Sequence, residues 1–221
     1  NWDLFSEMFL IYKFGLKRQT VTNQIMNYEH FSELFSIIQR INSILIDFSV
    51  NIWLYISRDY FCYDNGGDVG SSAMPHKINP ILFENAEGNL IMANGIFDIF
   101  NRKLPVSRWQ RDLTDSTIVR NFGTPYGHCI IAYKNLISGL NKITANKEVI
   151  KAELKKNVLV SSEIIQTILR SYGVPDAYET IKQLTQKHDK ISYQEIIEFV
   201  EQQEWVEECK QKIYDYLKLF E

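Results

Sequence analysis

The sequence predicts an all-α protein, with long helices first and a small helical domain after them. Apolar residues recur at steps of three and four between Phe31 and Ile52, as on one face of an α-helix. Neither glycine nor proline occurs between Gly15 and Gly66, so nothing in that stretch interrupts a helix. No segment shows a convincing strand alternation, and the chain contains no internal repeat.

The first long helix is expected from about residue 29 to residue 60, which at 1.5 Å per residue is roughly 45 to 50 Å. A helix of that length usually belongs to a bundle or to an oligomer core, because its own domain is too small to cover it. Residues 62–80 follow with three glycines, two prolines and almost no periodicity, so we expect a loop there.

The second helix is expected from Ile81 to about Lys103, since Pro80 suits a first helical turn and a Leu-Pro pair at residues 104–105 breaks the pattern. Gly88 and Gly95 lie seven residues apart on nearly the same face of this helix. A glycine within a helix costs roughly 1 kcal/mol relative to alanine. We therefore expect another helix to approach closely at both glycines.

A further helix is expected from residue 115 or 116 to about residue 140, with Pro125 kinking or ending it. After it the helices become short and carry start signals, of which Ser192 with Glu195 three residues later fits a capping box. We therefore predict two domains, 1–141 with the 62–80 loop and 142–221.

Composition limits the classes of function. The chain has 221 residues and a formal charge of −3, which argues against a general nucleic-acid binder. Its three cysteines are widely spaced, so the pattern favours reduced thiols in the cytoplasm over a disulfide framework or a zinc site. No apolar run is long enough to span a membrane, and no signal peptide is visible. The first residue is not Met, and we expect the chain to be a piece of a longer protein.

Residues 70–80 read Gly-Ser-Ser-Ala-Met-Pro-His-Lys-Ile-Asn-Pro and hold the most informative chemistry. The glycines allow unusual backbone conformations, Ser71 and Ser72 offer hydroxyls, and Lys77 offers a positive charge. With the amide of Asn79, this set suits an anionic substrate that gains negative charge during its reaction. From composition alone, a plain surface loop between two helices is the favoured reading.

The same segment resembles the signature of the fumarase/aspartase superfamily, Gly-Ser-Ser-x-Met-Pro-x-Lys-x-Asn-Pro, at every fixed position. The residues that follow, Phe-Glu-Asn-Ala-Glu-Gly-Asn at 83–89 and Lys-Leu-Pro-Val-Ser-Arg-Trp-Gln-Arg-Asp-Leu-Thr-Asp-Ser-Thr at 103–117, resemble adenylosuccinate lyases of the bacterial type. The resemblance implies a central helical bundle of the fumarase/aspartase type, followed by a small helical C-terminal domain.

The implied reaction is a β-elimination that splits adenylosuccinate into AMP and fumarate. The same enzyme is expected to split the succinyl-carboxamide ribotide of purine synthesis (SAICAR) into AICAR and fumarate. The resemblance makes Ser71 the general base. It makes the following residues substrate contacts: Gln24, Ser72, Lys77, Ile78, Asn79, Asn85, Arg111, Ser116, Thr117, Ile118, Val119 and Arg120.

Physical chemistry is consistent with the last part of that set, because two arginines and a hydroxyl at a helix N-terminus can hold a phosphate. Ordinary ion pairing of Arg111 and Arg120 with Asp112 or Asp115 is equally open from the residues alone. Three histidines have no metal-like spacing, and each is expected to be a capping, core or surface residue: His30, His128 and His188. His76 lies beside Lys77 in the signature, and we expect it to be a structural residue or to act behind the residues that contact the substrate.

Family members are about twice this length, and their general acid, a histidine, lies in an N-terminal half that this chain lacks. They are homotetramers whose active sites are each shared by three chains, so we expect this chain to be inactive alone. We expect no metal or organic cofactor, no nucleic-acid partner and no membrane partner. A 3-carboxymuconate cycloisomerase of the same superfamily and a non-catalytic structural relative remain alternatives.

Overall fold

The computed structural model describes residues 1–21, 25–64, 79–109, 113–186 and 191–218. The prediction of an all-α protein is confirmed, because helices dominate and the described residues contain only two three-residue strands. The chain forms two compact units, one of residues 1–57 and 63–143 and the other of residues 58–62 and 144–221. The elements in chain order are α1 (Trp2–Phe14), α2 (Glu29–Ser57), β1 (Phe61–Tyr63), α3 (Ile81–Lys103), α4 (Thr114–Val119), α5 (Gly123–Leu140), β2 (Ile143–Ala145), α6 (Lys147–Lys156), the 3-10 helix η1 (Val158–Ser161), α7 (Ser162–Ser171), α8 (Ala177–Gln186), α9 (Tyr193–Glu201) and α10 (Glu207–Leu217).

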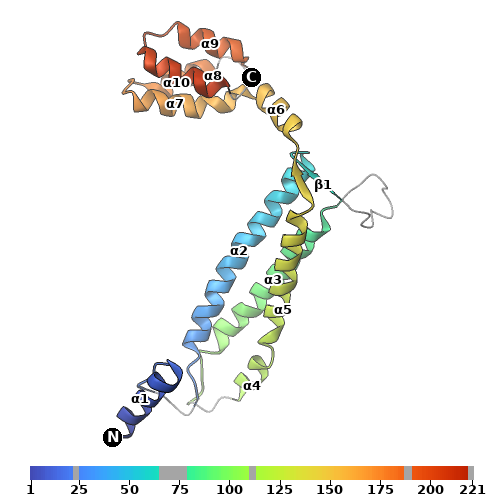
Figure 1. Ribbon diagram of the computed structural model, residues 1–221, viewed down its shortest axis with the longest axis vertical. Helices are drawn as coiled ribbons and strands as arrows, with labels where there is room; N and C mark the ends of the chain where they lie inside the picture. The colour runs from blue at the N-terminus through green and yellow to red at the C-terminus, as the bar shows by residue number, and fades with distance from the viewer. Residues whose placement is uncertain (22–24, 65–78, 110–112, 187–190, 219–221) are drawn as a thin grey trace. The chain divides into compact units, whose positions relative to one another are not determined.

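Three long helices, α2, α3 and α5, lie side by side in the first unit (Figure 1). Phe35 of α2 is fully buried at the centre of their aromatic core. The centroid of its ring lies 5.2 Å from that of Phe97, 5.4 Å from that of Phe100 and 5.3 Å from that of Phe122. Such aromatic contacts add to the apolar area that the three helices bury, and this core fixes the positions of the side chains that α3 and α5 carry.

A buried amide on α2 joins all three helices. The Asn42 side chain is fully buried, its Nδ2 donates to Asn94 Oδ1 of α3 at 2.9 Å, and its Oδ1 accepts from the Tyr133 hydroxyl of α5 at 2.7 Å. Burial, and then the neighbouring Cys129, raise the pKa of Tyr133 to about 12. A buried polar group with its bonds made favours one alignment of the helices, because a slip would leave it unsatisfied.

Gly88 and Gly95 do not mark a close helix approach among the described residues of this chain. A Cβ placed on either glycine of α3 would meet no atom of those residues within 4 Å. The close approach is at Gly139 of α5, where a Cβ would lie 2.8 Å from the ring of Phe83. The sequence-based expectation used the cost of a helical glycine, which identifies an unusual position but does not identify its neighbour.

The helix predicted from residue 115 or 116 to residue 140 is two helices. α4 ends at Val119 and α5 begins at Gly123. Pro125 lies in the first turn of α5, where its missing N–H removes no helical hydrogen bond. An ion pair holds α4 to the end of α3, because Lys103 Nζ lies 3.0 Å from Oδ1 of the buried Asp115 in the first turn of α4.

The second unit has its own apolar core, formed by η1 and α7 to α10. Ile165, Leu169 and Ile213 are among its fully buried side chains. The predicted capping box is present at the start of α9, where Ser192 Oγ accepts from the Glu195 N–H at 3.2 Å and Glu195 Oε2 accepts from the Ser192 N–H at 2.7 Å. This reciprocal cap satisfies two backbone donors that the first helical turn leaves free.

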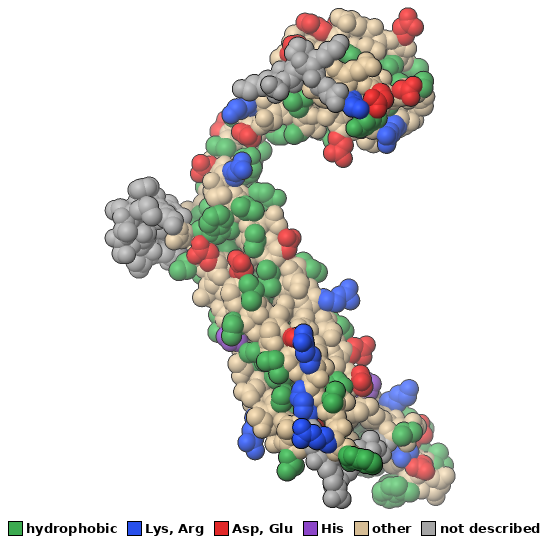
Figure 2. Space-filling view, turned by 180° about the vertical axis from the view of Figure 1, so that it is seen from behind, with side chains coloured by type: hydrophobic (Ala, Val, Ile, Leu, Met, Phe, Trp, Pro, Cys, Tyr) green, Lys and Arg blue, Asp and Glu red, His purple; other side chains and the backbone are tan. Residues whose placement is uncertain are grey.

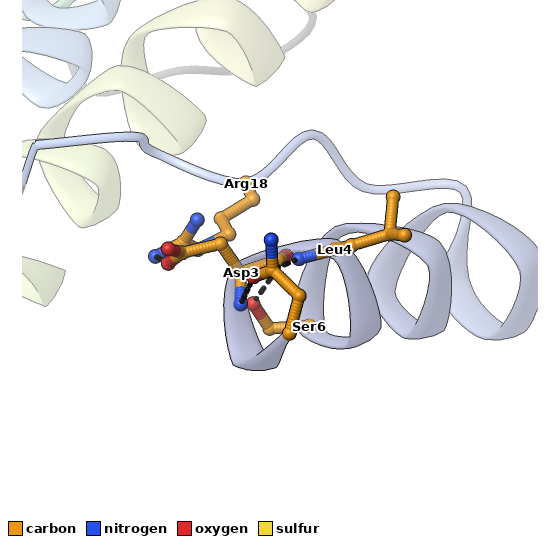
Figure 3. A network of polar contacts seen from close by, with 5 residues as sticks. Asp3, Leu4, Ser6 and Arg18 are labelled. Atoms are coloured by element: carbon orange, nitrogen blue, oxygen red, sulfur yellow. Dashed lines mark hydrogen bonds and ion pairs between the residues drawn. The ribbon is translucent and has the colours of Figure 1, made fainter.

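Helix α1 is not predicted by the sequence pattern. The Asn1 side chain caps it by accepting from the Asp3 N–H at 3.0 Å, and Arg18 returns to pair with Asp3 at 2.7 Å (Figure 3). Gly15 ends the helix with a φ of 64°, a left-handed conformation that costs glycine little. None of the α1 residues is buried, so its caps mark its limits more clearly than its apolar pattern does.

Candidate functional site

The structure describes seven of the residues that the resemblance assigns to the site: Asn79, Asn85, Ser116, Thr117, Ile118, Val119 and Arg120. The proposed base Ser71 lies outside the described residues, as do Gln24, Ser72, Lys77, Ile78 and Arg111. The described candidate residues lie on or next to α3 and α4, and the side chains that contact them come from α3, α4 and α5.

Asn79 lies two residues before the first residue of α3. Its backbone carbonyl accepts from the Ile81 N–H at 2.8 Å, and the carbonyl of Pro80 accepts from the Phe83 N–H at 3.0 Å. Pro80 is the N-cap of the helix with a φ of −78°, close to the angle that its ring imposes. Asn79 therefore sits where the signature segment meets the N-terminus of a long, well-packed helix.

Asn85 is one turn into α3, with an exposed side chain. Its Oδ1 accepts from Asn89 Nδ2 at 2.9 Å and from Asn135 Nδ2 of α5 at 2.6 Å. Asn89 Oδ1 in turn lies 2.8 Å from His128 Nδ1 of α5. Sequence patterns do not indicate this network, because its members come from two helices and the contact between Asn89 and His128 spans 39 positions of the chain.

The run Ser116 to Arg120 lies on α4 and just after it. Ser116 is in the first turn of α4, as predicted, and its hydroxyl donates to the Leu113 carbonyl at 2.8 Å. Its hydroxyl oxygen and the exposed Arg120 remain accessible to a ligand. Thr117 and Ile118 of the same run line a hollow of about 240 Å³ between α3, α4 and α5. The other residues that line it are Ile96, Ile99, Phe100, Asn121 and Thr124.

The alternative reading, in which Arg120 pairs with Asp115, is wrong. The buried Asp115 carboxylate is paired with Lys103, and Arg120 makes no ion pair within the described part of the chain. A guanidinium that no carboxylate neutralises is available to an anionic ligand. The structure thus leaves Arg120 free for the phosphate contact that the resemblance implies.

Asn85 and the run Ser116 to Arg120 do not come together in one chain. Asn85 is near the first residue of α3, whereas α4 follows the last residue of α3, so they lie toward opposite ends of the three-helix unit (Figure 1). Along the axis of α3, the distance from Asn85 to Lys103 is roughly 27 Å at 1.5 Å per residue. One small substrate does not bridge that distance.

Two family profiles match the chain. The profile described as Adenylosuccinate lyase C-terminal matches residues 107–218, and the profile described as Lyase matches residues 4–95. The chain belongs to the adenylosuccinate lyase family. That family is part of the fumarase/aspartase superfamily. The Ser116 to Arg120 run lies in the segment that the C-terminal profile matches, and Asn85 lies in the segment that the Lyase profile matches.

Curated members of the adenylosuccinate lyase family are closely similar to the chain. The adenylosuccinate lyase of Vibrio cholerae is 46% identical over 84% of this chain and 41% of its own length. That of Dictyostelium discoideum is 48% identical over 84% of this chain and 40% of its length, and that of Haemophilus influenzae is 41% identical over 96% and 46%. The match therefore spans 40 to 46% of the length of these relatives, which is less than half.

A solved structure gives the same fold at low identity. The crystal structure of a fumarate lyase/delta crystallin from Brucella melitensis bound to cobalt matches 98% of this chain and 47% of its own, with a TM-score of 0.64 and 18% identity. This similarity supports the helical fold. In the described part of the chain, no helix has both the length and the apolar character that crossing a membrane requires.

Proposed function

We propose that this chain is the C-terminal part of an adenylosuccinate lyase. The enzyme splits adenylosuccinate into AMP and fumarate, and it splits SAICAR into AICAR and fumarate. The observation that carries the proposal is an identity of 41 to 48% to enzymes of that name over most of this chain. The chain retains every fixed residue of the superfamily signature at 70–80, which a non-catalytic relative would not need.

The proposed reaction is a β-elimination. Ser71 removes a proton from the carbon next to a carboxylate of the succinyl group, and the electron pair forms the carbon–carbon double bond of fumarate. The bond from carbon to nitrogen breaks, and a general acid protonates the departing nitrogen. We assign that acid to a histidine of the N-terminal part that the family has and this chain does not contain.

Serine is a weak base at its ordinary pKa, so its anion needs a positive field and the exclusion of water. Lys77 is six residues from Ser71 in the same signature and is the proposed source of that field. It also stabilises the carboxylate whose charge grows in the transition state. Proton transfer and charge stabilisation suffice for this elimination, and we propose no metal or organic cofactor.

The remaining residues bind the substrate in this proposal. The nucleotide phosphate is held by Arg111, Arg120 and the hydroxyls of Ser116 and Thr117, since guanidinium groups and a helix N-terminus attract anions. The other contacts are made by Gln24, Ser72, Ile78, Asn79, Asn85, Ile118 and Val119. The absence of an ion pair at Arg120 in the described residues supports its part in this set.

We propose a homotetramer in which three chains share each active site. Asn85 and the Ser116 to Arg120 run lie toward opposite ends of the unit, so a site that uses both needs them from different chains. Helix α2 also exposes an apolar stripe along one face, Leu34, Ile37, Ile41 and Ile44, and the last side chain is 69% exposed. Figure 2 shows apolar side chains along the outside of the first unit, as expected of helices that pack against other copies.

The two units correspond, in this proposal, to the C-terminal part of the central bundle and to the small C-terminal domain of the family. The division near residue 143 supports this assignment. We also propose a cytoplasmic enzyme of purine nucleotide biosynthesis. The free thiols of Cys62, Cys129 and Cys209 are consistent with a reducing compartment.

The experiment that tests the proposal follows adenylosuccinate cleavage by ultraviolet absorbance, using the protein that contains this chain together with its N-terminal part. Ser71→Ala is measured alongside the wild type. Cleavage that collapses in the variant supports both the reaction and the base. Cleavage that survives in the variant moves the base to another residue, and no cleavage by the wild type overturns the proposed function.

A further inference from the structure

In the amide network around Asn85, a contact with a backbone atom determines which side-chain groups donate and which accept. Asn89 Nδ2 lies 2.8 Å from the backbone carbonyl oxygen of Asn85, four residues earlier on α3. A carbonyl oxygen only accepts, so the atom that faces it is the amide nitrogen, which donates. This contact fixes the orientation of the Asn89 carboxamide.

Each neighbouring group then has only one possible role. Because Asn89 Nδ2 also lies 2.9 Å from the Asn85 side chain, the Asn85 atom that faces it is the acceptor Oδ1. The Asn135 atom 2.6 Å from Oδ1 is therefore a donor, Nδ2. Asn89 Oδ1 is an acceptor, so His128 carries a proton on Nδ1, 2.8 Å away.

These hydrogen bonds occupy Oδ1 of the Asn85 carboxamide and leave its Nδ2 available to a ligand. Oδ1 accepts twice, whereas Nδ2 has no hydrogen-bond partner in the described residues, and the side chain is exposed. The helices beneath it are tightly packed, since the ring of Phe83 on α3 lies against Gly139 of α5. The group that Asn85 offers to a ligand is a pair of N–H donors held in one orientation.

We propose that Asn89, His128 and Asn135 are positioning residues that make Asn85 a dedicated hydrogen-bond donor to an oxygen of the anionic substrate. The inference rests on the proposed function, in which Asn85 contacts that substrate. An asparagine that could turn freely would present its carbonyl oxygen as often, and that oxygen would repel a carboxylate or a phosphate. The network removes this second orientation before the substrate binds, so less of the binding free energy is spent on ordering.

The test uses the protein that contains this chain with its N-terminal part, and adenylosuccinate as the varied substrate. Asn135→Asp replaces the donor against Asn85 Oδ1 with an acceptor, so the Asn85 carboxamide turns and its N–H groups point away from the substrate. We expect KM to rise about tenfold, the factor for one charge-assisted hydrogen bond of roughly 1.4 kcal/mol, with kcat changed less than about twofold. Asn51→Asp is the matched control, because Asn51 is also a half-buried helical asparagine. Among the described residues its side chain bonds only its own helix, where Nδ2 donates to the Asp47 carbonyl at 2.8 Å.

His128 supplies a rescue test that separates positioning from folding. His128→Leu removes the donor to Asn89 and is expected to raise KM about threefold, less than Asn135→Asp because it acts through one more bond. His128→Asn restores KM to within about twofold of the wild type, since its amide nitrogen occupies the place of Nδ1. Thermal unfolding followed by circular dichroism shows whether each variant is folded.

A rise in KM for Asn135→Asp and His128→Leu, with rescue by His128→Asn, supports the inference. Wild-type KM values in both variants overturn it. A loss of kcat without rescue by His128→Asn also overturns it, because that is the mark of a purely structural role. A wild type that does not cleave adenylosuccinate overturns the proposed function and, with it, this inference.

Discussion

The contact between Gly139 and Phe83 makes Gly139→Ala the most informative stability variant. A Cβ at Gly139 would lie 2.8 Å and 2.9 Å from two ring atoms of Phe83, closer than carbon atoms approach without something shifting. The Phe83 ring is fully buried and cannot move into solvent. The variant therefore forces α5 away from α3 or displaces the ring within a packed core.

The expected magnitude is the difference of two effects. Overpacking a core costs roughly 1 to 3 kcal/mol, and replacing a helical glycine with alanine returns about 1 kcal/mol. We therefore expect Gly139→Ala to lower the free energy of unfolding by about 0 to 2 kcal/mol. Gly127→Ala is the matched control on the same helix, because a Cβ there meets nothing within 4 Å, and it is expected to stabilise by up to about 1 kcal/mol.

The assay is urea unfolding of the 221-residue chain followed by circular dichroism, with the transition of the first unit compared among the three proteins. A Gly139→Ala variant as stable as Gly127→Ala would contradict this expectation. That result would mean that α3 and α5 do not pack as closely as the structure has them.

Three further predictions concern other contacts. Lys103→Met leaves the buried Asp115 carboxylate without its ion pair and is expected to cost about 3 kcal/mol in urea unfolding, a loss that a wild-type midpoint would contradict. The pKa of Tyr133 is about 10 in the unfolded chain and about 12 in the folded chain. The contribution of the neutral Tyr133 to the free energy of unfolding is therefore complete below pH 10 and is lost as the pH rises from 10 to 12. Tyr133→Phe is expected to make this loss of free energy of unfolding with pH shallower, as measured by urea titrations at several pH values. An unchanged pH dependence in the variant would show that Tyr133 is not its source. Ser192→Ala removes one side of the capping box and is expected to destabilise the second unit by about 1 kcal/mol, whereas equal shifts in both units would argue against a local effect.

The sequence predicts most of the helices because strong signals mark their ends. α3 begins and ends at Ile81 and Lys103, as the flanking prolines indicate, and α2 ends at Ser57, a few residues before the predicted end. The two strands were not predicted, because three residues are too few to show alternation. Helix α1 was not predicted either, since none of its residues is buried.

Some residues of the candidate site can be identified from a sequence motif, whereas others can be identified only from the packing of the helices. The signature identifies residues such as Ser71 and Lys77, because their order along the chain is itself the evidence. The histidine of the Asn85 network was expected to be a capping, core or surface residue, since only the packing of α3 against α5 brings His128 beside Asn89. Likewise, only the structure pairs Asp115 with Lys103 rather than with Arg120.

A lyase that depends on Ser71 is tested most directly by a product analysis of adenylosuccinate incubated with the protein that contains this chain and its N-terminal part. We expect fumarate and AMP in equal amounts, formed by the wild type and not by Ser71→Ala. Absence of either product with the wild type, or equal formation by the variant, would contradict a lyase that depends on the Ser71 segment.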